Sequence, residues 1–179
     1  YDPKTNSWTR LEDLRTARAG HTATPLPDGR VVIAGGETPG ASGTREVTAS
    51  VEVFDPAARR WSQGGSLTTG RAGHTATPLP DGRLMVSGGQ TNEERGGSAI
   101  FVAAGSAIVP SASAEIYDPQ AGVWSPAPSL ATQRAGHTAT LLPSGQVVVV
   151  GGYTKGGNVP VATAERYDAT TNRWTTIGT

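Results

Sequence analysis

The hydrophobic pattern of this chain consists of short β-prone runs separated by turn residues. His21 to Leu26 and Arg30 to Ala34 are two such runs, and Pro27-Asp28-Gly29 between them is a tight hairpin signal. Turns of the same kind follow at Pro80-Asp81-Gly82 and at Pro143-Ser144-Gly145. The pattern predicts pairs of antiparallel strands joined by hairpins.

Two more strands are predicted after each of these hairpins. The third covers residues 49–54, 112–117 and 162–167 and leads into a turn that begins with aspartate. The fourth is centred on a tryptophan, and the tryptophans lie 53, 63 and 50 residues apart. The pattern therefore predicts a unit of four antiparallel strands with a period of about fifty residues. The four tryptophans are Trp8, Trp61, Trp124 and Trp174.

Other residues recur in the same register and make the units repeats of one another. The sequence Arg-Ala-Gly-His-Thr-Ala-Thr begins at Arg18, at Arg71 and at Arg134, and each copy leads to a Gly-Gly pair. We expect the glycines to admit a neighbouring backbone or a sharp turn, and the tyrosines and tryptophans to pack one unit on the next. The paired glycines are Gly35, Gly36, Gly88, Gly89, Gly151 and Gly152.

These residues resemble the kelch repeat, in which a hydrophobic strand ends in Gly-Gly and a spaced tyrosine and tryptophan follow. The resemblance covers essentially the whole chain. The particular residues look like those of the bacterial branch of the family that includes the propeller domain of galactose oxidase. Because each kelch repeat forms one blade of a β-propeller, the resemblance implies an all-β fold of four-stranded antiparallel blades arranged radially about a channel.

Counting strands gives three complete blades and one extra strand. We assign residues 15–62 to blade 1, residues 63–125 to blade 2 with an inserted loop at 90–111, residues 126–179 to blade 3, and residues 1–14 to the outer strand of a preceding blade. Propellers typically close with about 4 to 8 blades. We therefore expect part of a larger six- or seven-bladed ring, closed by further blades of the same chain or by a second copy.

Composition and charge exclude several kinds of partner and site. The 15 basic and 15 acidic residues balance, so we expect no nucleic-acid binding, and the apolar runs are too short for membrane insertion. The chain has no cysteine, which excludes disulfides, thiolate metal sites and the tyrosine–cysteine crosslink that the galactose oxidase family needs for its copper radical. We expect no cofactor. We expect an extracellular or cell-surface bacterial location.

Three histidines, one in each repeat, invite a metal-site hypothesis because histidine is the commonest metal ligand. His21, His74 and His137 occupy equivalent positions on neighbouring sheets. Such positions lie about 10 Å apart or more, whereas Zn–N bonds are roughly 2.0–2.1 Å long. We therefore predict no metal site, and a structural role in which each imidazole bonds to neighbouring backbone.

Arg18, Arg71 and Arg134 precede the innermost strand of each blade and would recur around one end of the channel. A ring of guanidinium groups could bind carboxylate or sulfate groups, so these arginines are candidate binding residues. The alternative, which the repetition favours, is ion pairing between blades with the repeated glutamates. Those glutamates are Glu52, Glu115 and Glu165, which we also expect to pair with arginine or to cap backbone amides within the blade.

The loop between the second and third strands of blade 2, residues 90–111, departs from the repeat. It has a polar beginning and an apolar middle, and irregular loops on a rigid scaffold commonly carry binding. The alternative is that its apolar part extends the two strands into a longer hairpin that covers the neighbouring blade. The candidate binding residues on this face are Asn92, Glu93, Glu94, Arg95, Phe101 and Tyr153.

The sequence favours a non-catalytic scaffold that binds a protein or a glycan through its loop face. Every strongly patterned residue has a role in building a blade, so no catalytic residue is predicted. No phosphate-binding glycine loop, nucleophile elbow or His-Glu-x-x-His pair is present. The alternative is a propeller enzyme, either an oxidase or a carbohydrate-active enzyme, whose catalytic residues lie in other blades or domains.

Overall fold

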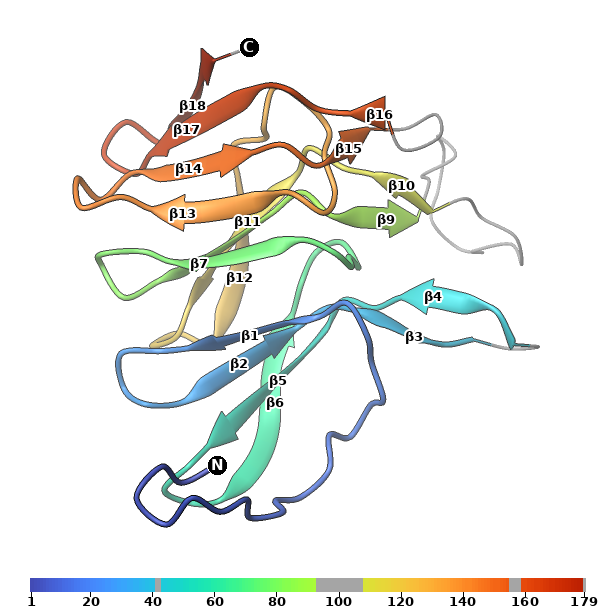
Figure 1. The fold of residues 1–179 in the computed structure, drawn as a ribbon, viewed down its shortest axis with the longest axis vertical. Coiled ribbons are helices and arrows are strands. Elements are labelled where there is room, and N and C mark those ends of the chain that lie inside the picture. The colour runs from blue at the N-terminus through green and yellow to red at the C-terminus, as the bar shows by residue number, and fades with distance from the viewer. Residues whose placement is uncertain (41–42, 93–107, 155–158, 179) are drawn as a thin grey trace.

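A computed structural model of the chain describes residues 1–40, 43–92, 108–154 and 159–178. The elements named within these ranges are all β-strands, as the resemblance implied. Three four-stranded antiparallel sheets follow one another in sequence order along the long axis of the molecule (Figure 1). Each sheet corresponds to one predicted blade.

The strands of each blade pair in the order in which the repeat presents them, apart from two short strands inserted between the second and the third. Blade 1 contains β1 (Thr22–Pro25), β2 (Val31–Ala34), β5 (Ser50–Asp55) and β6 (Arg60–Ser66). Blade 2 contains β7 (Thr75–Pro78), β8 (Leu84–Ser87), β11 (Ala114–Asp118) and β12 (Val123–Ala127). Blade 3 contains β13 (Thr138–Leu141), β14 (Val147–Val150), β17 (Ala164–Asp168) and β18 (Arg173–Gly178).

The inserted strands form three short hairpins that we call the arms. All three arms project from the same side of the molecule (Figure 1). Sequence reasoning considered such a hairpin only in blade 2 and did not predict the other two. The arms are β3 (Glu37–Pro39) with β4 (Arg45–Val47), β9 (Gln90–Asn92) with β10 (Ile108–Pro110), and β15 (Tyr153–Thr154) with β16 (Val159–Pro160).

Residues 1–14 contain no strand, although the sequence pattern predicted the outer strand of a preceding blade there. What remains is the turn: Asp2 and Ser7 form an isolated bridge, and the rings of Tyr1 and Trp8 lie 5.3 Å apart, as Phe54 and Trp61 do at 4.9 Å in blade 1. An outer strand needs a third strand beside it. No described strand pairs with this segment.

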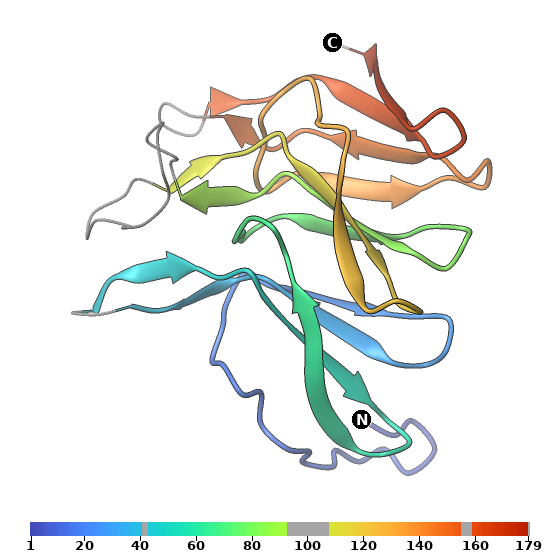
Figure 2. The same cartoon turned by 180° about the vertical axis from the view of Figure 1, so that it is seen from behind.

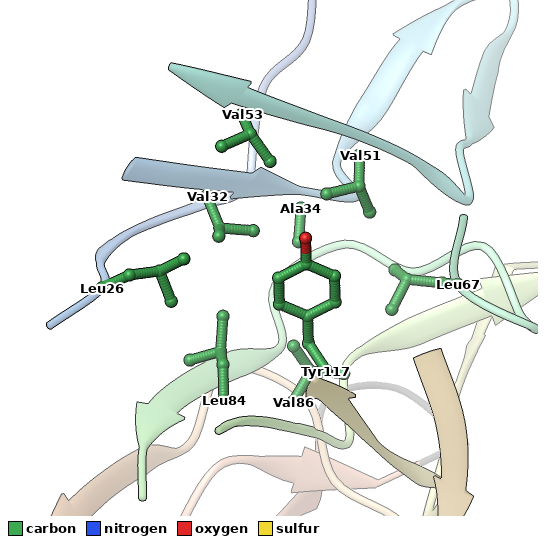
Figure 3. Close-up of a cluster of buried hydrophobic side chains, with 9 residues drawn as sticks. All are labelled: Leu26, Val32, Ala34, Val51, Val53, Leu67, Leu84, Val86 and Tyr117. Atoms are coloured by element: carbon green, nitrogen blue, oxygen red, sulfur yellow. The ribbon is translucent and has the colours of Figure 1, made fainter. Parts of the chain in front are cut away.

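The hydrophobic core lies between blades rather than within one. In the cluster between blades 1 and 2, side chains from β2 and β5 meet side chains from β8 and β11, and Tyr117 points into their midst (Figure 3). Leu79 and Met85 meet Val147 and Tyr167 in the same way between blades 2 and 3. Because burying a large apolar side chain is worth about 1.5–3 kcal/mol, these interfaces dominate the stability of the fold.

Contacts between blades extend from the inner strands to the outer ones. β7 contacts both β1 and β13, which places these three strands innermost. Seen from behind, the long outer strands β6, in green, and β12, in gold, run along the back of blades 1 and 2 (Figure 2), and they are also in contact. The blades therefore form a fan that opens away from the inner strands.

Candidate functional site

Each blade is held together by a buried arginine that we call the clasp. In blade 2, Nη1 of Arg71 donates to the carbonyls of Gly88 and Ser113, at 2.8 and 3.0 Å. Its Nη2 donates to Oγ of Ser113 at 3.0 Å and to Oε1 of Glu115 at 2.8 Å. The side chain of Arg71 is fully buried, and burial lowers its pKa from the ordinary value, while the hydrogen bond that it donates to Glu115 opposes that shift. Four hydrogen bonds thus hold the two terminal nitrogens of this buried guanidinium, while its Nε is buried without a hydrogen-bond partner.

The clasp is repeated in the other two blades, where Arg18 pairs with Glu52 and Arg134 with Glu165, both at 2.8 Å. Pairing with the repeated glutamates was expected between blades. The structure corrects this, because each pair lies within one blade. None of the three guanidinium groups is exposed, so they do not form a surface ring for an anionic ligand.

The clasp glutamate also fixes the segment that enters its blade. The carboxylate of Glu115 accepts the backbone N–H groups of Thr68 and Thr69, at 2.6 and 3.3 Å. Glu52 and Glu165 accept the equivalent pairs of N–H groups in blades 1 and 3. The clasp therefore sets the position from which each inner strand starts.

The repeated histidines join one blade to the next. Nε2 of His74 in blade 2 bonds Oγ1 of Thr22 in blade 1, and Nε2 of His137 in blade 3 bonds Oγ1 of Thr75 in blade 2, both at 3.0 Å. Their partner is thus a hydroxyl group and not the backbone that was predicted. Burial lowers the pKa of His74 to about 3 and that of His137 to about 4, so both rings are neutral at neutral pH.

No metal centre is formed in the part of the chain that the structure describes, where no three histidine, aspartate or glutamate side chains come together. Within the same ranges, no helix is long and apolar enough to cross a membrane. Both findings apply to the described residues alone.

The Gly-Gly pairs bring the backbones of adjacent blades into contact. The N–H of Gly36 donates to the carbonyl of Arg71 at 2.7 Å, and the N–H of Gly89 donates to that of Arg134 at 2.9 Å. A Cβ atom on Gly89 would lie 2.7 Å from Cβ of His74, closer than real Cβ atoms approach. These glycines are therefore needed for the close approach that the sequence pattern predicted.

The arms line up along one edge of the three blades, which we call the arm face. β4 contacts β9, and β10 contacts β15, so each arm touches the next. The first residue of every arm forms an isolated bridge with the alanine that follows the clasp arginine. The three bridges are Ala19 with Glu37, Ala72 with Gln90, and Ala135 with Tyr153.

Glu37, Gln90 and Tyr153 hold the same structural position in three blades but differ in chemistry. Glu37 forms an exposed ion pair of 2.9 Å with Arg45 of its own arm. Tyr153 lies against the backbone of Gly136. Sequence reasoning selected only Tyr153, yet a signal for the other two was present, since all three directly follow a Gly-Gly pair.

The other candidates fall in or beyond the second arm. Asn92 is the last residue of β9 and pairs in register with Ile108. The two ends of the 90–111 loop thus pair as a short two-stranded hairpin, while most of its apolar part lies outside the described residues, so neither hypothesis for this loop is tested. The remaining candidates lie outside the described residues: Glu93, Glu94, Arg95 and Phe101.

The opposite edge of the fan contains an open groove of about 740 Å³ between blades 2 and 3. Nε2 of Gln146 and two backbone N–H groups bond the carboxylate of Asp168 there and lower its pKa. The sequence pattern did not indicate this groove. Residues that line it include Pro80, Asp81, Leu142, Ser144, Asp168 and Thr170.

Four-stranded antiparallel sheets that pack face to face, with their first strands innermost, define the chain as a run of β-propeller blades. The family model described as "Kelch motif" matches residues 134–179. The chain is 31% identical over 177 residues to Kelch-like protein 34 of Homo sapiens, covering 99% of this chain and 24% of that protein. It is 33% identical over 124 residues to an F-box/kelch-repeat protein of Arabidopsis thaliana, covering 69% of this chain and 28% of that protein.

The solved structure of YjhT, a kelch propeller, superposes with a TM-score of 0.76 at 19% identity. The superposition covers 96% of this chain and 55% of YjhT. The last blade therefore matches the kelch motif, and the chain is similar to kelch-repeat proteins; it spans about a quarter of the length of the curated relatives it matches.

Proposed function

We propose that these blades form a protein-interaction scaffold whose partner binds the arm face. Kelch-repeat proteins are generally protein-interaction scaffolds. The observation that supports the arm face is the variation in residue type at one equivalent position. Glu37, Gln90 and Tyr153 differ there, although each forms the same backbone bridge with an alanine. A repeat that only builds blades has no need of three different residues there.

Position and charge make the arm face suitable for a peptide or a protein surface. Arm 1 presents the Glu37–Arg45 ion pair, and arm 3 presents Val159, which is 52% exposed. Contacts between successive arms place the charged end and the apolar end along one row. Such a mixed surface resembles protein interfaces, in which apolar and aromatic contacts lie beside charged ones.

Selection from a random peptide library displayed on phage tests this proposal. The target is the whole chain, and the selected peptides are then measured against the triple variant E37A/Q90A/Y153A. We expect affinity for the variant to fall at least tenfold. The matched control is R60A/Q120A/T171A, three exposed residues in or next to the outer turns of the three blades, and it should bind the peptides like the unmodified chain.

Equal binding to both triple variants would rule out the arm face. A glycan array, probed with the same three proteins, addresses the glycan hypothesis. Glycan binding that the arm-face variant loses, together with no peptide selected, would replace the proposed protein partner with a carbohydrate. Bacterial origin, secretion, likeness to galactose oxidase and a catalytic role for other blades remain predictions from the sequence.

A further inference from the structure

Blade 1 and blade 3 each have one outward face that packs against no other blade of the described chain, and we call these the free faces. The junctions between adjacent blades show what kind of surface each free face would bind. At the junction of blades 1 and 2, Val32 and Val53 pair across β2 and β5 and pack toward blade 2. Val148 and Arg166 form the equivalent pair in blade 3, across β14 and β17. On this free face Val150 is 46% exposed. Blade 3 thus presents to solvent the surface that blade 1 buries.

Blade 1 presents the opposite half of the same junction. In blade 2, Leu84 and Tyr117 pair in register and are buried against blade 1. Val31 and Phe54 are the corresponding pair in blade 1, and both are only half-buried. The free faces at the two ends of the fan are therefore complementary and not alike.

Backbone groups at the two ends are complementary as well. At the internal junctions a Gly-Gly N–H donates to the carbonyl of a clasp arginine, as from Gly89 to Arg134 at 2.9 Å. Blade 3 has the corresponding N–H on Gly152, and blade 1 has the corresponding carbonyl on Arg18. No backbone hydrogen bond joins either group to another described residue.

We propose that two copies of this chain associate head to tail, with blade 3 of each copy packed on blade 1 of the other. The chain covers 55% of the kelch propeller YjhT, so two copies supply about the number of blades in a closed ring of that size. Both new junctions would repeat the internal ones, from the apolar pairs to the Gly152 to Arg18 hydrogen bond. The occupant of each free face is thus a second copy.

Arg166 gives the new junction a feature that the internal ones lack. It stands where blades 1 and 2 have Val53 and Ile116, both apolar. At the internal junction Val53 lies in the same cluster as Tyr117 of the next blade. By the same register, Arg166 would face Phe54 of the second copy, whose ring can accept a guanidinium on its face.

Association requires residues 1–8 to move aside. Their bridge and ring pair repeat the turn made by Tyr167 and Trp174, so both would occupy the same place beside blade 1. Trp8 is 84% exposed, and beyond this segment the carbonyl of Glu12 accepts the indole N–H of Trp61 at 2.8 Å. So exposed a segment is easily displaced by β18 of the second copy.

Light scattering after size-exclusion chromatography tests the proposal on the whole chain. One copy has a mass of 18.3 kDa, and we expect twice that, about 36.6 kDa. V150D on blade 3 and V31D on blade 1 should each give the mass of one copy. The matched control is V123D, which changes a valine with 50% exposure on β12 and should keep the doubled mass. Circular dichroism confirms that each variant is folded, and R166E replaces V150D if that variant is not.

Mixing V150D with V31D distinguishes head-to-tail pairing from other kinds of dimer. Each variant keeps one intact face, so the mixture should regain the doubled mass through a single junction. A monomeric unmodified chain at about 100 μM, a concentration above most specific dissociation constants, would overturn the proposal. So would a doubled mass that V150D leaves unchanged, a mixture that stays monomeric, or a series of higher masses, which would indicate an open chain of copies.

Discussion

Two arginine–glutamate pairs in this chain have nearly the same geometry and opposite surroundings. Arg71 and Glu115 are 2.8 Å apart, with 0% and 3% of their side chains exposed. Arg45 and Glu37 are 2.9 Å apart, with 77% and 21% exposed. The buried pair recurs in every blade, whereas the exposed pair occurs in the first arm. Distance alone therefore does not show what an ion pair contributes.

Repetition separates the two roles better than residue type does. Clasps, inter-blade histidines and paired glycines are the same in each blade because each blade must satisfy the same buried groups. The residues that begin the arms differ because the blades do not constrain them. The arginines that were candidate binding residues therefore belong to the repeated framework of the blades. The residues after the Gly-Gly pairs belong to the positions that vary from blade to blade.

The largest loss of unfolding free energy is expected from R71M, which removes the buried ion pair between Arg71 and Glu115. It leaves the carboxylate of Glu115 buried with only the two N–H groups of Thr68 and Thr69. Breaking one partner of a buried pair costs about 3–5 kcal/mol of unfolding free energy. Urea unfolding measures this, and R71M/E115Q should recover part of the loss. A change below about 1 kcal/mol, the range of exposed pairs, would remove the distinction drawn between clasp and arm.

A smaller effect is expected from G89A, which tests whether the repeated glycines are needed for close approach. Gly89 and Gly29 have nearly the same φ, +90° and +88°, but only Gly89 has atoms within 4 Å of the added Cβ. Both variants bear the cost of an unfavourable φ, about 1–2 kcal/mol. G89A should lose a further 1–3 kcal/mol, roughly, from overpacking. Equal midpoints of thermal unfolding for the two variants would contradict this.

The repeat determined most of what could be predicted. Alternation and turn residues located the strands of the blades because side-chain period and hairpin chemistry are local properties. The arms were not predicted: Glu37 and Pro39 have little β propensity, and this strand pairs with β4 because the blade holds both ends of the hairpin together. Residues 1–14 show the converse, a strand-like sequence that pairs with no described strand.

Contacts between repeats could be predicted in kind but not in detail. Pairing of Arg18 with Glu52 follows from two buried charges, yet whether it lies within or between blades depends on three-dimensional register. His74 similarly was expected to bond backbone, and only the packing of β7 on β1 shows that Thr22 is its partner. Periodicity identifies the residues that repeat but not the neighbours that they meet.

Lowering the pH should weaken the fold through its histidines. The pKa values of His74 and His137 fall to about 3 and about 4 in the folded chain, below the value of about 6.5 for an unfolded histidine. The unfolded state alone binds protons between these values, so stability is complete above pH 6.5 and falls as pH decreases. From pH 6.5 to 5.5 each histidine should account for about 1 kcal/mol. The variant H74N should lose the contribution of His74 to the decrease of unfolding free energy with falling pH. An unchanged decrease in H74N would contradict the assignment of this pH dependence to the buried histidines.

The smallest effect is expected from R45M, the exposed counterpart of R71M. Removing Arg45 leaves Glu37 at the surface, where water replaces the lost partner, and exposed pairs contribute about 0–1 kcal/mol. Any loss of unfolding free energy should shrink further in 0.5 M salt, where the Debye length is only about 4 to 5 Å. Chemical denaturation at two salt concentrations measures both. A loss as large as that of R71M would mean that the arm supports the blade, and Glu37 would then belong to the framework and not to the surface that we propose for binding.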